Sequence, residues 1–327
     1  MNVTWARDLR GAEADAFDAF VLGSPSGHYA QTRAWAEVAR AAGTFVTSLA
    51  VVRAGGAIVG TALVTRPAVA GVGMPWARIE RGPVVRDVDC VAEATRAIAR
   101  TMRRRGVAWL RVMPYWAGED ADRVERALRS DGWRDAQTVG GSHALTLRLD
   151  LTGKDDAALF AGKAREQVRW RARQAEKAGA TARVGTGEDW TRLRAMHAGT
   201  MRAQGRRGRP PAWWGALERF ASDDARGRLF ACDLDGRCVA AAVVLRHGPL
   251  AVYAWGASVA EKLPFTKAVP ALVAGIRWAR DAGCSTFDLG GIPLPEDRDP
   301  KRAAIATFKH DFDRTPVRLV REHAGWC

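Results

Sequence analysis

The sequence presents the same succession of elements twice, and this repeat limits the possible folds more than any other feature. Residues 49–60 form an apolar stretch, a Gly-Gly turn and a second apolar stretch, and residues 229–240 repeat the pattern around Asp-Gly. Both dipeptides supply the positive φ that short hairpin turns need. In each half a segment with helical spacing then ends on a glycine, Gly106 or Gly283, and a strand-like segment follows. We therefore predict two related α/β lobes, each a mixed β-sheet with flanking helices.

The boundary between the predicted lobes lies where residues 143–151 alternate between apolar and polar side chains like a strand. We place the first lobe at 1–146 and the second at 147–313. The last segment, 314–327, alternates like an edge strand, and we predict that it returns to the first lobe. The order of elements in each lobe resembles the acetyltransferase (GNAT) architecture, so the predicted fold class is two tandem GNAT-like lobes.

That architecture usually binds the pyrophosphate of coenzyme A with an R/Q-x-x-G-x-G/A loop between a strand and a helix. Residues 103–108, Arg-Arg-Arg-Gly-Val-Ala, match this pattern in their letters. The match ends a predicted helix and begins a strand, so no helix N-terminus with free N–H groups would face a phosphate. The sequence therefore disfavours ordinary coenzyme A chemistry.

The charge and the cysteines of the chain restrict the classes of partner and of structural site that it can have. The 327 residues carry a net charge of +14, which favours nucleic acid, an anionic membrane surface or a phosphorylated substrate, although a generally arginine-rich composition gives the same charge. No stretch of transmembrane length lacks charges and the first ten residues lack an apolar segment, so we expect a soluble, cytoplasmic monomer without stable membrane insertion. Five scattered cysteines without a CxxC pair argue against a disulfide framework and a metal site.

Several motifs occur together in one order along the chain. They are QTRAWAEVAR at 31–40, RGPVV at 81–85, LRLDL at 147–151, DLGGI at 288–292 and FKHDF at 308–312. Together they resemble the FemABX family, whose members take an amino acid from aminoacyl-tRNA and attach it to an amine of a peptidoglycan precursor. The resemblance implies two GNAT-like lobes without a long coiled-coil arm, aminoacyl-tRNA as co-substrate with no further cofactor, and a peptide or nucleotide-linked peptide as acceptor.

Within FKHDF, the resemblance assigns Lys309 to the reaction, beside the ester and the acceptor. A fixed cation there would stabilise the oxyanion that forms when an amine attacks the ester. We expect Phe308 and Phe312 to anchor the turn that aims the ammonium group. From the residues alone, a surface lysine whose stem packs between two aromatic side chains is the alternative. No general base can be assigned from the sequence.

Four basic residues recur every fourth position in the predicted helix at 163–177 and form one stripe. Like charges at this spacing repel one another, so the stripe favours an anionic partner, and we predict that it binds the tRNA acceptor stem. A solvated surface helix is the alternative. We expect Trp170, on the same helix, to pack on its lobe, with stacking on an exposed base as the alternative. The stripe consists of Arg165, Arg169, Arg173 and Lys177.

The resemblance also implies an acceptor site that draws on both lobes. In the second lobe an arginine-dense loop and two aromatic side chains at a strand end are the candidates, with core packing as the alternative for the aromatic pair. In the first lobe the motif residue Trp35 is followed at Glu37 by an acid where the family often has a lysine, and Met113 stands where it often has an aspartate. The second-lobe candidates are Arg202, Arg206, Arg207, Arg209, Tyr253 and Trp255.

These departures predict that the reaction is kept and the acceptor has changed. Two acceptors remain open: an unusual cell-wall precursor, and a peptide antibiotic or other natural product capped from aminoacyl-tRNA. A coenzyme A-dependent N-acyltransferase of envelope polysaccharide assembly is the alternative enzyme, because it uses the same lobe. A non-catalytic basic binding module is the third possibility. Digestion of tRNA abolishes a tRNA-dependent transfer but not a coenzyme A-dependent one. Replacement of Lys309 should impair either enzyme but leave a non-catalytic binding module unchanged.

Overall fold

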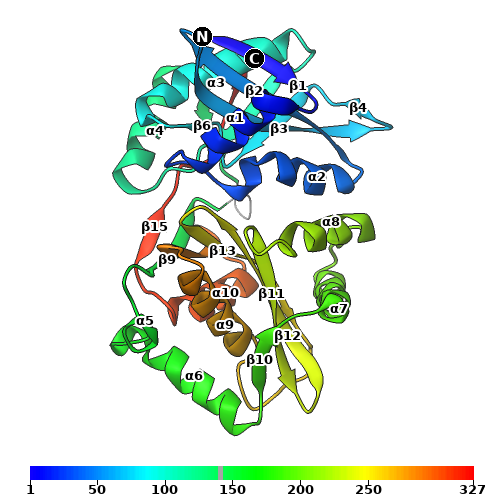
Figure 1. Ribbon diagram of the computed structural model, residues 1–327, viewed down its shortest axis with the longest axis vertical. Helices are drawn as coiled ribbons and strands as arrows, with labels where there is room; N and C mark the ends of the chain where they lie inside the picture. The colour runs from blue at the N-terminus through cyan, green and yellow to red at the C-terminus, as the bar shows by residue number, and fades with distance from the viewer. Residues whose placement is uncertain (139–142) are drawn as a thin grey trace. The chain divides into compact units, whose positions relative to one another are not determined.

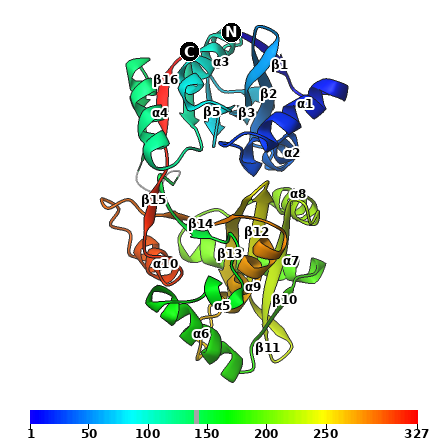
Figure 2. The same cartoon turned by 60° about the vertical axis from the view of Figure 1, so that its left-hand side comes forward.

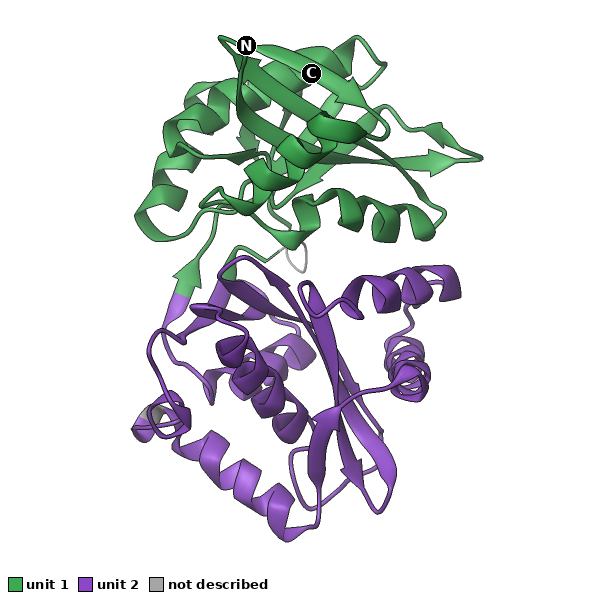
Figure 3. Ribbon diagram, viewed as in Figure 1, with its two compact units in different colours: residues 1–145, 317–327 green, residues 146–316 purple. Residues whose placement is uncertain are grey.

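The computed structural model describes residues 1–138 and 143–327 and divides into two compact units (Figure 3). Unit 1 comprises residues 1–145 and 317–327, and unit 2 comprises residues 146–316. The predicted lobes were 1–146 and 147–313, with 314–327 returning to the first. Within the described residues, no helix is long and apolar enough to cross a membrane.

Unit 1 contains a mixed sheet in the order β1-β2-β3-β5-β7-β16-β8, with β4 and β6 paired to β3 (Figure 1). The predicted hairpin is confirmed, because β2 ends and β3 begins on either side of Gly55 and Gly56. The pair β5–β7 is parallel, and the other pairs in the unit are antiparallel. The strands are β1 (Asn2–Ala6), β2 (Phe45–Ala54), β3 (Ala57–Val69), β4 (Val72–Gly73), β5 (Trp76–Glu80), β6 (Val84–Val85), β7 (Trp109–Met113), β8 (Arg134–Asp135) and β16 (His323–Trp326).

Helices cover both faces of this sheet, because alternate residues of its strands point to opposite sides. Val51 packs with the helix residue Phe17 in one buried cluster, whereas its neighbour Val52 packs with Ile98 and Leu128 in the other. The first cluster lies under α1 (Gly11–Leu22) and α2 (Arg33–Ala41), and the second under α3 (Val91–Arg103) and α4 (Gly118–Ser130).

The C-terminal segment enters the sheet of unit 1 as an interior strand. Figure 2 shows β16 as a red strand near the C-terminus. β16 pairs with β7 on one side and with β8 on the other. The prediction of an edge strand is therefore wrong, and the burial of β16 does not alternate along the strand. His323 and Ala324 are almost fully buried, while Trp326 at the strand end is exposed.

Unit 2 repeats the scheme in the order β10-β11-β12-β13-β14-β9-β15. The second predicted hairpin is confirmed, because β11 and β12 meet at Asp235 and Gly236. β13 and β14 are parallel, as β5 and β7 are in unit 1. The strands are β9 (Leu145–Asp150), β10 (Thr181–Val184), β11 (Gly227–Leu234), β12 (Arg237–His247), β13 (Leu250–Ser258), β14 (Thr286–Ile292) and β15 (Pro316–Arg318).

Helix α9 packs closely on this sheet at a glycine. A Cβ on Gly275 would lie 2.7 Å from Val244 Cγ2 and 3.3 Å from the ring of Phe230, so a larger residue would force the helix away. α10 packs against β14. The helices of the unit are α5 (Asp156–Leu159), α6 (Glu166–Lys177), α7 (Gly187–Ala203), α8 (Pro211–Ala221), α9 (Ala268–Asp281) and α10 (Pro300–His310).

One local prediction in unit 2 needs correction, the turn expected to carry Lys309. β14 runs through Gly290 and Gly291 to Ile292. Residues 300–310 form α10, so Lys309 lies in the last turn of a helix and not in an irregular turn. Pro300 at the first helical position and the side chain of Asp299, which accepts a hydrogen bond from Lys301 N at 2.9 Å, start this helix.

Candidate active site

Lys309 is buried inside unit 2. Only 7% of the residue is exposed, and its Nζ donates a hydrogen bond of 2.7 Å to the carbonyl oxygen of Gly291 on β14. Burial lowers the pKa of Lys309 to about 8, and the nearby carboxylate of Asp288 opposes this fall. The alternative of a snorkelling surface lysine is therefore wrong. Side chains whose pKa is strongly shifted by burial are concentrated at functional sites.

The ammonium group lies where two parallel strands diverge. β13 and β14 pair from Leu250 and Thr286 as far as Val252 and Asp288, and both strands continue beyond the last described pair. We call the region beyond this last pair the fork, and Gly290 lies in it with a φ of +74°. A Cβ on Gly290 would lie 3.1 Å from the carbonyl oxygen of Tyr253 and 3.4 Å from Lys309 Nζ. Both the conformation and the space therefore require glycine.

Asp288 binds the N–H side of the Gly290–Gly291 segment, whose carbonyl side is bound by Lys309. Its carboxylate accepts hydrogen bonds from Gly290 N at 2.7 Å, from Arg148 Nε at 3.2 Å and from the Thr146 hydroxyl. Asp288 is 2% exposed, so its charge is compensated inside the unit. The segment Gly290–Gly291 is thus held by Asp288 at its N–H and by Lys309 at its carbonyl. Sequence reasoning missed Asp288, although a single acid in the apolar strand TFDLGGI was the available signal.

The end of α10 is fixed by arginines from the α6 region. Arg171 pairs with Asp311 at 2.9 Å. Arg165 donates to the carbonyl oxygen of Phe312 at 3.0 Å and pairs with Asp313 at 3.3 Å. These contacts hold the chain directly after Lys309 and so restrain the direction of its side chain.

The predicted basic stripe is consequently divided. Arg165 precedes α6, which begins at Glu166, and Arg169 donates to the carbonyl oxygens of Phe160 and Gly162. Arg173 and Lys177 are exposed. Trp170 is 52% exposed, so the expectation that it packs on the lobe is wrong. The exposed part of the stripe therefore consists of Arg173 and Lys177, and the exposed indole of Trp170 lies on the same helix.

The predicted arginine loop joins α7 to α8 and leads into an aromatic cluster. Arg209 stacks over Trp213 at 5.2 Å, and Trp213 contacts Trp255 at a ring distance of 5.1 Å. Trp214 lies 5.1 Å from both Trp213 and His197. Burial, followed by the charge of Arg209, lowers the pKa of His197. Arg202 ends α7, and Arg202, Arg206, Arg207 and Arg209 are all exposed.

Tyr253 belongs to the fork itself. Its ring turns back over Gly256, where a Cβ would lie 1.9 Å from the phenol oxygen. Burial raises the pKa of Tyr253 to about 12, so the phenol remains protonated at neutral pH. The structure thus brings the main chain of Tyr253 next to Gly290 and its ring over Gly256, whereas Trp255 contacts the aromatic cluster on α8.

In unit 1, a chain of aromatic contacts connects the motif tryptophan to the region after β7. Trp35 lies 4.9 Å from Tyr29, which lies 4.3 Å from His28, which in turn lies 4.6 Å from Tyr115. The sequence interpretation missed the last three. Glu37 is exposed and has no ion-pair partner among the described residues. Met113 is fully buried, which corrects the expectation that its side chain lines the acceptor side.

Buried Gln31 explains the Gln-x-x-x-Trp motif. Its side chain donates to the carbonyl oxygen of Glu80 at 2.6 Å and accepts from Leu63 N at 2.8 Å. It therefore ties the start of α2, and with it Trp35, to β3 and β5. A Cβ on Gly82 would lie 2.6 Å from the Gln31 amide, which accounts for the glycine of the RGPVV motif.

One cluster in unit 2 has the composition of a metal site. The ligand atoms of Asp189, Asp233 and Cys238 lie within 4.8 Å of one another. Arg183 pairs with both carboxylates at 2.6 Å, and burial raises the pKa of the Cys238 thiol to about 11. Arginine already neutralises the acids and the thiol stays protonated, so the cluster is a structural salt bridge.

Comparison with protein families identifies the chain's relatives. A model described as the FemAB family matches residues 12–205, more than half of the chain, and a model described as an acetyltransferase (GNAT) domain matches residues 162–302. The chain belongs to the FemAB family. The resemblance predicted from the motifs is thereby confirmed, and this FemAB protein is a tRNA-dependent aminoacyltransferase of that family. A comparison with curated protein sequences gave no match.

Solved structures confirm the predicted fold. A crystal structure of FemX is similar over 100% of this chain and 98% of its own, with a TM-score of 0.81 and 17% identity. L-PGS from Bacillus licheniformis is similar over 95% and 90% of the two chains, with a TM-score of 0.61 and 14% identity. A tandem GNAT protein from the clavulanic acid biosynthesis pathway covers 99% and 98%, with a TM-score of 0.58 and 12% identity. The FemAB protein therefore consists of two tandem GNAT-like lobes.

Proposed function

We propose that this FemAB protein joins the aminoacyl group of aminoacyl-tRNA to the amine of a peptide acceptor, with Lys309 as the cation at the reacting ester. The observation that carries the proposal is the position of Lys309, which is buried where the pairing of β13 and β14 ends and donates there to the carbonyl oxygen of Gly291. Because its co-substrate is tRNA, we propose that it acts in the cytoplasm.

The proposed reaction is an aminolysis. The neutral amine attacks the ester carbon, a C–N bond forms and the C–O bond to the tRNA ribose breaks. One proton leaves the amine and one is delivered to the ribose oxygen, so the products are a peptide bond and free tRNA. Negative charge collects on the former carbonyl oxygen in the tetrahedral intermediate, and a donor placed there lowers the barrier.

Lys309 is suited to this role by its charge and its restraint. A pKa of about 8 leaves roughly nine-tenths of the side chains protonated at pH 7. Among the described residues, Nζ donates to Gly291 alone, so two of its three N–H groups are left for an oxyanion. The same pKa leaves a neutral fraction that can accept the amine proton, and the pH dependence of the rate separates the two roles.

We propose that tRNA phosphates contact the exposed part of the α6 stripe, Arg173 and Lys177. Arg165 and Arg169 are half-buried, and they support the site indirectly because their guanidinium groups bind main-chain carbonyl oxygens. Arg173 also donates to a carbonyl oxygen, that of Arg169, but it remains exposed. For the acceptor, we propose contacts with Tyr253 and the exposed loop arginines 202, 206, 207 and 209.

We further propose that the acceptor lacks a nucleotide diphosphate near α2. Glu37 is exposed and has no ion-pair partner among the residues that the structure describes, so it would repel a phosphate. This favours a peptide natural product or a cell-wall peptide without that group. Trp35, fixed through Gln31, would contact the acceptor beside it.

The coenzyme A alternative has one specific observation in its favour, the match to a GNAT domain over 162–302. The local geometry opposes it. At the start of α9 the carbonyl oxygens of Val259 and Glu261 point at the Lys267 ammonium group, so that loop presents acceptors, and not N–H donors, where a pyrophosphate would bind. In unit 1, residues 103–108 end α3 and lead into β7.

A transfer assay tests the proposal. Total tRNA charged with labelled amino acids is mixed with the protein and, in parallel, with UDP-linked muramyl pentapeptide or a pool of peptide amines from the producing cells. We expect RNase-sensitive transfer to the peptide amines. Transfer from acyl-coenzyme A that resists RNase, with none from tRNA, would refute the proposal. Transfer to the UDP-linked acceptor alone would refute the role given to Glu37 and leave the reaction standing.

A further inference from the structure

Three tryptophans lie in register at one end of the unit 1 sheet. Trp76 on β5 pairs with Trp109 on β7, and Trp109 pairs with Trp326 on β16. Directly paired residues place their side chains on the same face of a sheet. The rings of Trp109 and Trp326 are 5.0 Å apart at 81°. We call these three side chains the tryptophan row.

The row leaves much of its surface to solvent. Trp326 is 77% exposed and Trp76 is 38% exposed. Tryptophan is among the largest apolar side chains, and large apolar side chains that are exposed next to one another often mark a binding site. Edge-to-face contact with Trp109 leaves ring surface of Trp326 available for another planar group.

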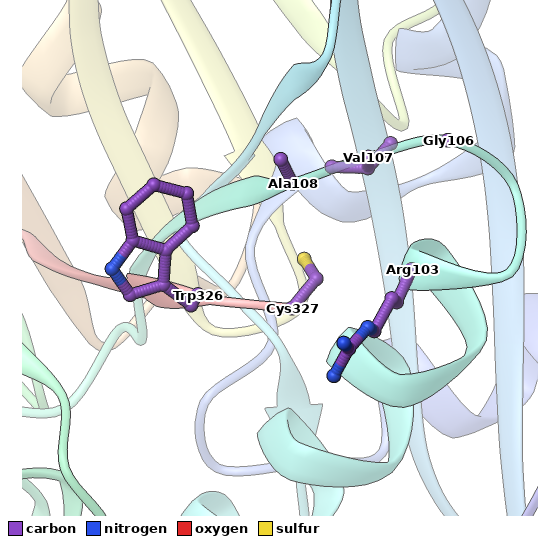
Figure 4. A pocket seen from close by; sticks show the side chains of 6 residues that line it. All are labelled: Arg103, Gly106, Val107, Ala108, Trp326 and Cys327. Atoms are coloured by element: carbon purple, nitrogen blue, oxygen red, sulfur yellow. The ribbon is translucent and has the colours of Figure 1, made fainter.

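A cavity of about 470 Å³ adjoins Trp326 at the end of the row, although Trp76 and Trp109 do not line it, and this volume is within the range of small-ligand sites. Figure 4 shows Arg103 at the end of α3 and Trp326 on β16, on either side of Cys327, with the backbone of Gly106 and Val107 above them. Arg103 and its neighbour Arg104 are exposed and form no ion pair with a described residue. Arg105 is occupied, because it stacks over Trp5 at 5.4 Å.

The position separates this cavity from the proposed acceptor residues. Trp109 begins β7 and Met113 ends it, so the row and Met113 are about 13 Å apart at roughly 3.3 Å per residue. The aromatic chain from Trp35 to Tyr115 lies at the Met113 end. The cavity is therefore a second feature of unit 1 that the proposed reaction does not use.

We propose that the cavity and the tryptophan row bind an unpaired nucleotide of the tRNA substrate, with the base stacked on Trp326 and its phosphate on Arg103 and Arg104. Stacking aromatic side chains beside a cationic groove is the general device for holding single-stranded nucleic acid. The inference rests on the tRNA dependence stated above. Exposed Val69 and Val72 on the neighbouring hairpin would suit a membrane surface, but the feature at Trp326 is a hollow lined by the Arg103 guanidinium group, which suits a nucleotide.

The test measures the affinity for uncharged tRNA, which is independent of acceptor and transfer. Trp326→Ala should weaken tRNA binding about 5- to 100-fold, whereas Trp326→Phe should keep most of the affinity, because base stacking needs a ring. Arg103→Gln should lower the slope of log K against log salt by about one. Arg126→Gln, which removes an exposed charge from α4 in the same unit, is the control and should change affinity less than Arg103→Gln does.

Protection experiments locate the contact. Saturating tRNA should slow alkylation of Cys327, which lines the cavity, and leave Cys90 unchanged. If the wild type binds tRNA and Trp326→Ala binds it equally well, this inference is overturned and the proposed function stands. The same holds if Trp326→Ala keeps its affinity for tRNA but loses binding to anionic phosphatidylglycerol vesicles. Equal loss in the Ala and Phe variants would also overturn it. Failure of the wild-type protein to bind tRNA would overturn the proposed function as well.

Discussion

Replacement of Lys309 by methionine tests whether this side chain is kept for the reaction or for the fold. Lys309 has a pKa of about 8 inside the protein against an ordinary value of 10.5. At about 1.36 kcal/mol per pH unit, the buried charge costs roughly 3 kcal/mol of folding free energy at pH 7. Removing it also removes the hydrogen bond to Gly291 O, a loss of about 1–3 kcal/mol. We therefore expect K309M to be as stable as the wild type, or up to about 2 kcal/mol more stable.

The sign of the pH dependence sharpens this expectation. The unfolded chain binds the lysine proton more tightly, so the wild-type protein gains stability as the pH rises from about 8 to 10.5. The advantage of K309M should thus be largest below pH 8 and disappear by pH 10.5. Denaturant midpoints of both proteins at pH 7 and pH 10 measure it.

The activity of the same variant completes the test. Loss of an oxyanion donor lowers kcat by about 10²–10³-fold, so we expect an inactive, stable protein that still binds tRNA. The matched control is Lys301→Met, which removes an exposed lysine from the same helix and should change neither property. A K309M protein that loses more than about 2 kcal/mol at pH 7 would refute the reasoning, because Lys309 would then be a structural tether.

Three further predictions follow from the site. Gly290→Ala places a Cβ 3.1 Å from Tyr253 O at positive φ, so it should destabilise unit 2 by about 1–2 kcal/mol and reduce kcat, as measured by urea unfolding and the transfer assay. Arg171→Gln releases Asp311 at the end of α10, and we expect a lower kcat with unchanged tRNA affinity; weaker tRNA binding would argue against its structural role. Glu37→Lys should lower the KM for UDP-linked muramyl pentapeptide at least tenfold, by removing one repulsive charge and adding an attractive one, and an unchanged KM would count against the acceptor assignment.

The repeat in the sequence was sufficient for the fold because its signals are local. Hairpin turns at Gly55–Gly56 and Asp235–Gly236 require particular dihedral angles, and helix ends at Gly106 and Gly283 require the same. The neighbours of a strand are set by distant segments, so no local signal could reveal that β16 has β8 on its far side. For the same reason the tryptophan row was invisible: Trp76, Trp109 and Trp326 become neighbours only when three strands are in register.

The candidate site was predictable where a motif encodes it and not where contacts decide it. Lys309 and the glycine pair stand out in the sequence, and the structure explains the glycines through the fork. Spacing alone placed Arg165, Arg169 and Arg173 on one charged stripe, but a guanidinium group can equally bind a main-chain carbonyl, and all three donate to one. Burial of Met113 depends on the packing around β7, which one sequence does not show.

The two units differ where the repeat would make them alike. In unit 1 the parallel strands β5 and β7 stay paired over all five residues, from Trp76 and Trp109 to Glu80 and Met113. In unit 2 the corresponding strands β13 and β14 pair only as far as Val252 and Asp288 and then diverge. A closed ladder satisfies its own N–H and C=O groups, whereas a fork leaves main-chain groups and space for a side chain. Lys309 Nζ lies beside this opening in unit 2 and donates to Gly291 O, whereas the corresponding ladder of unit 1 is paired along its whole described length.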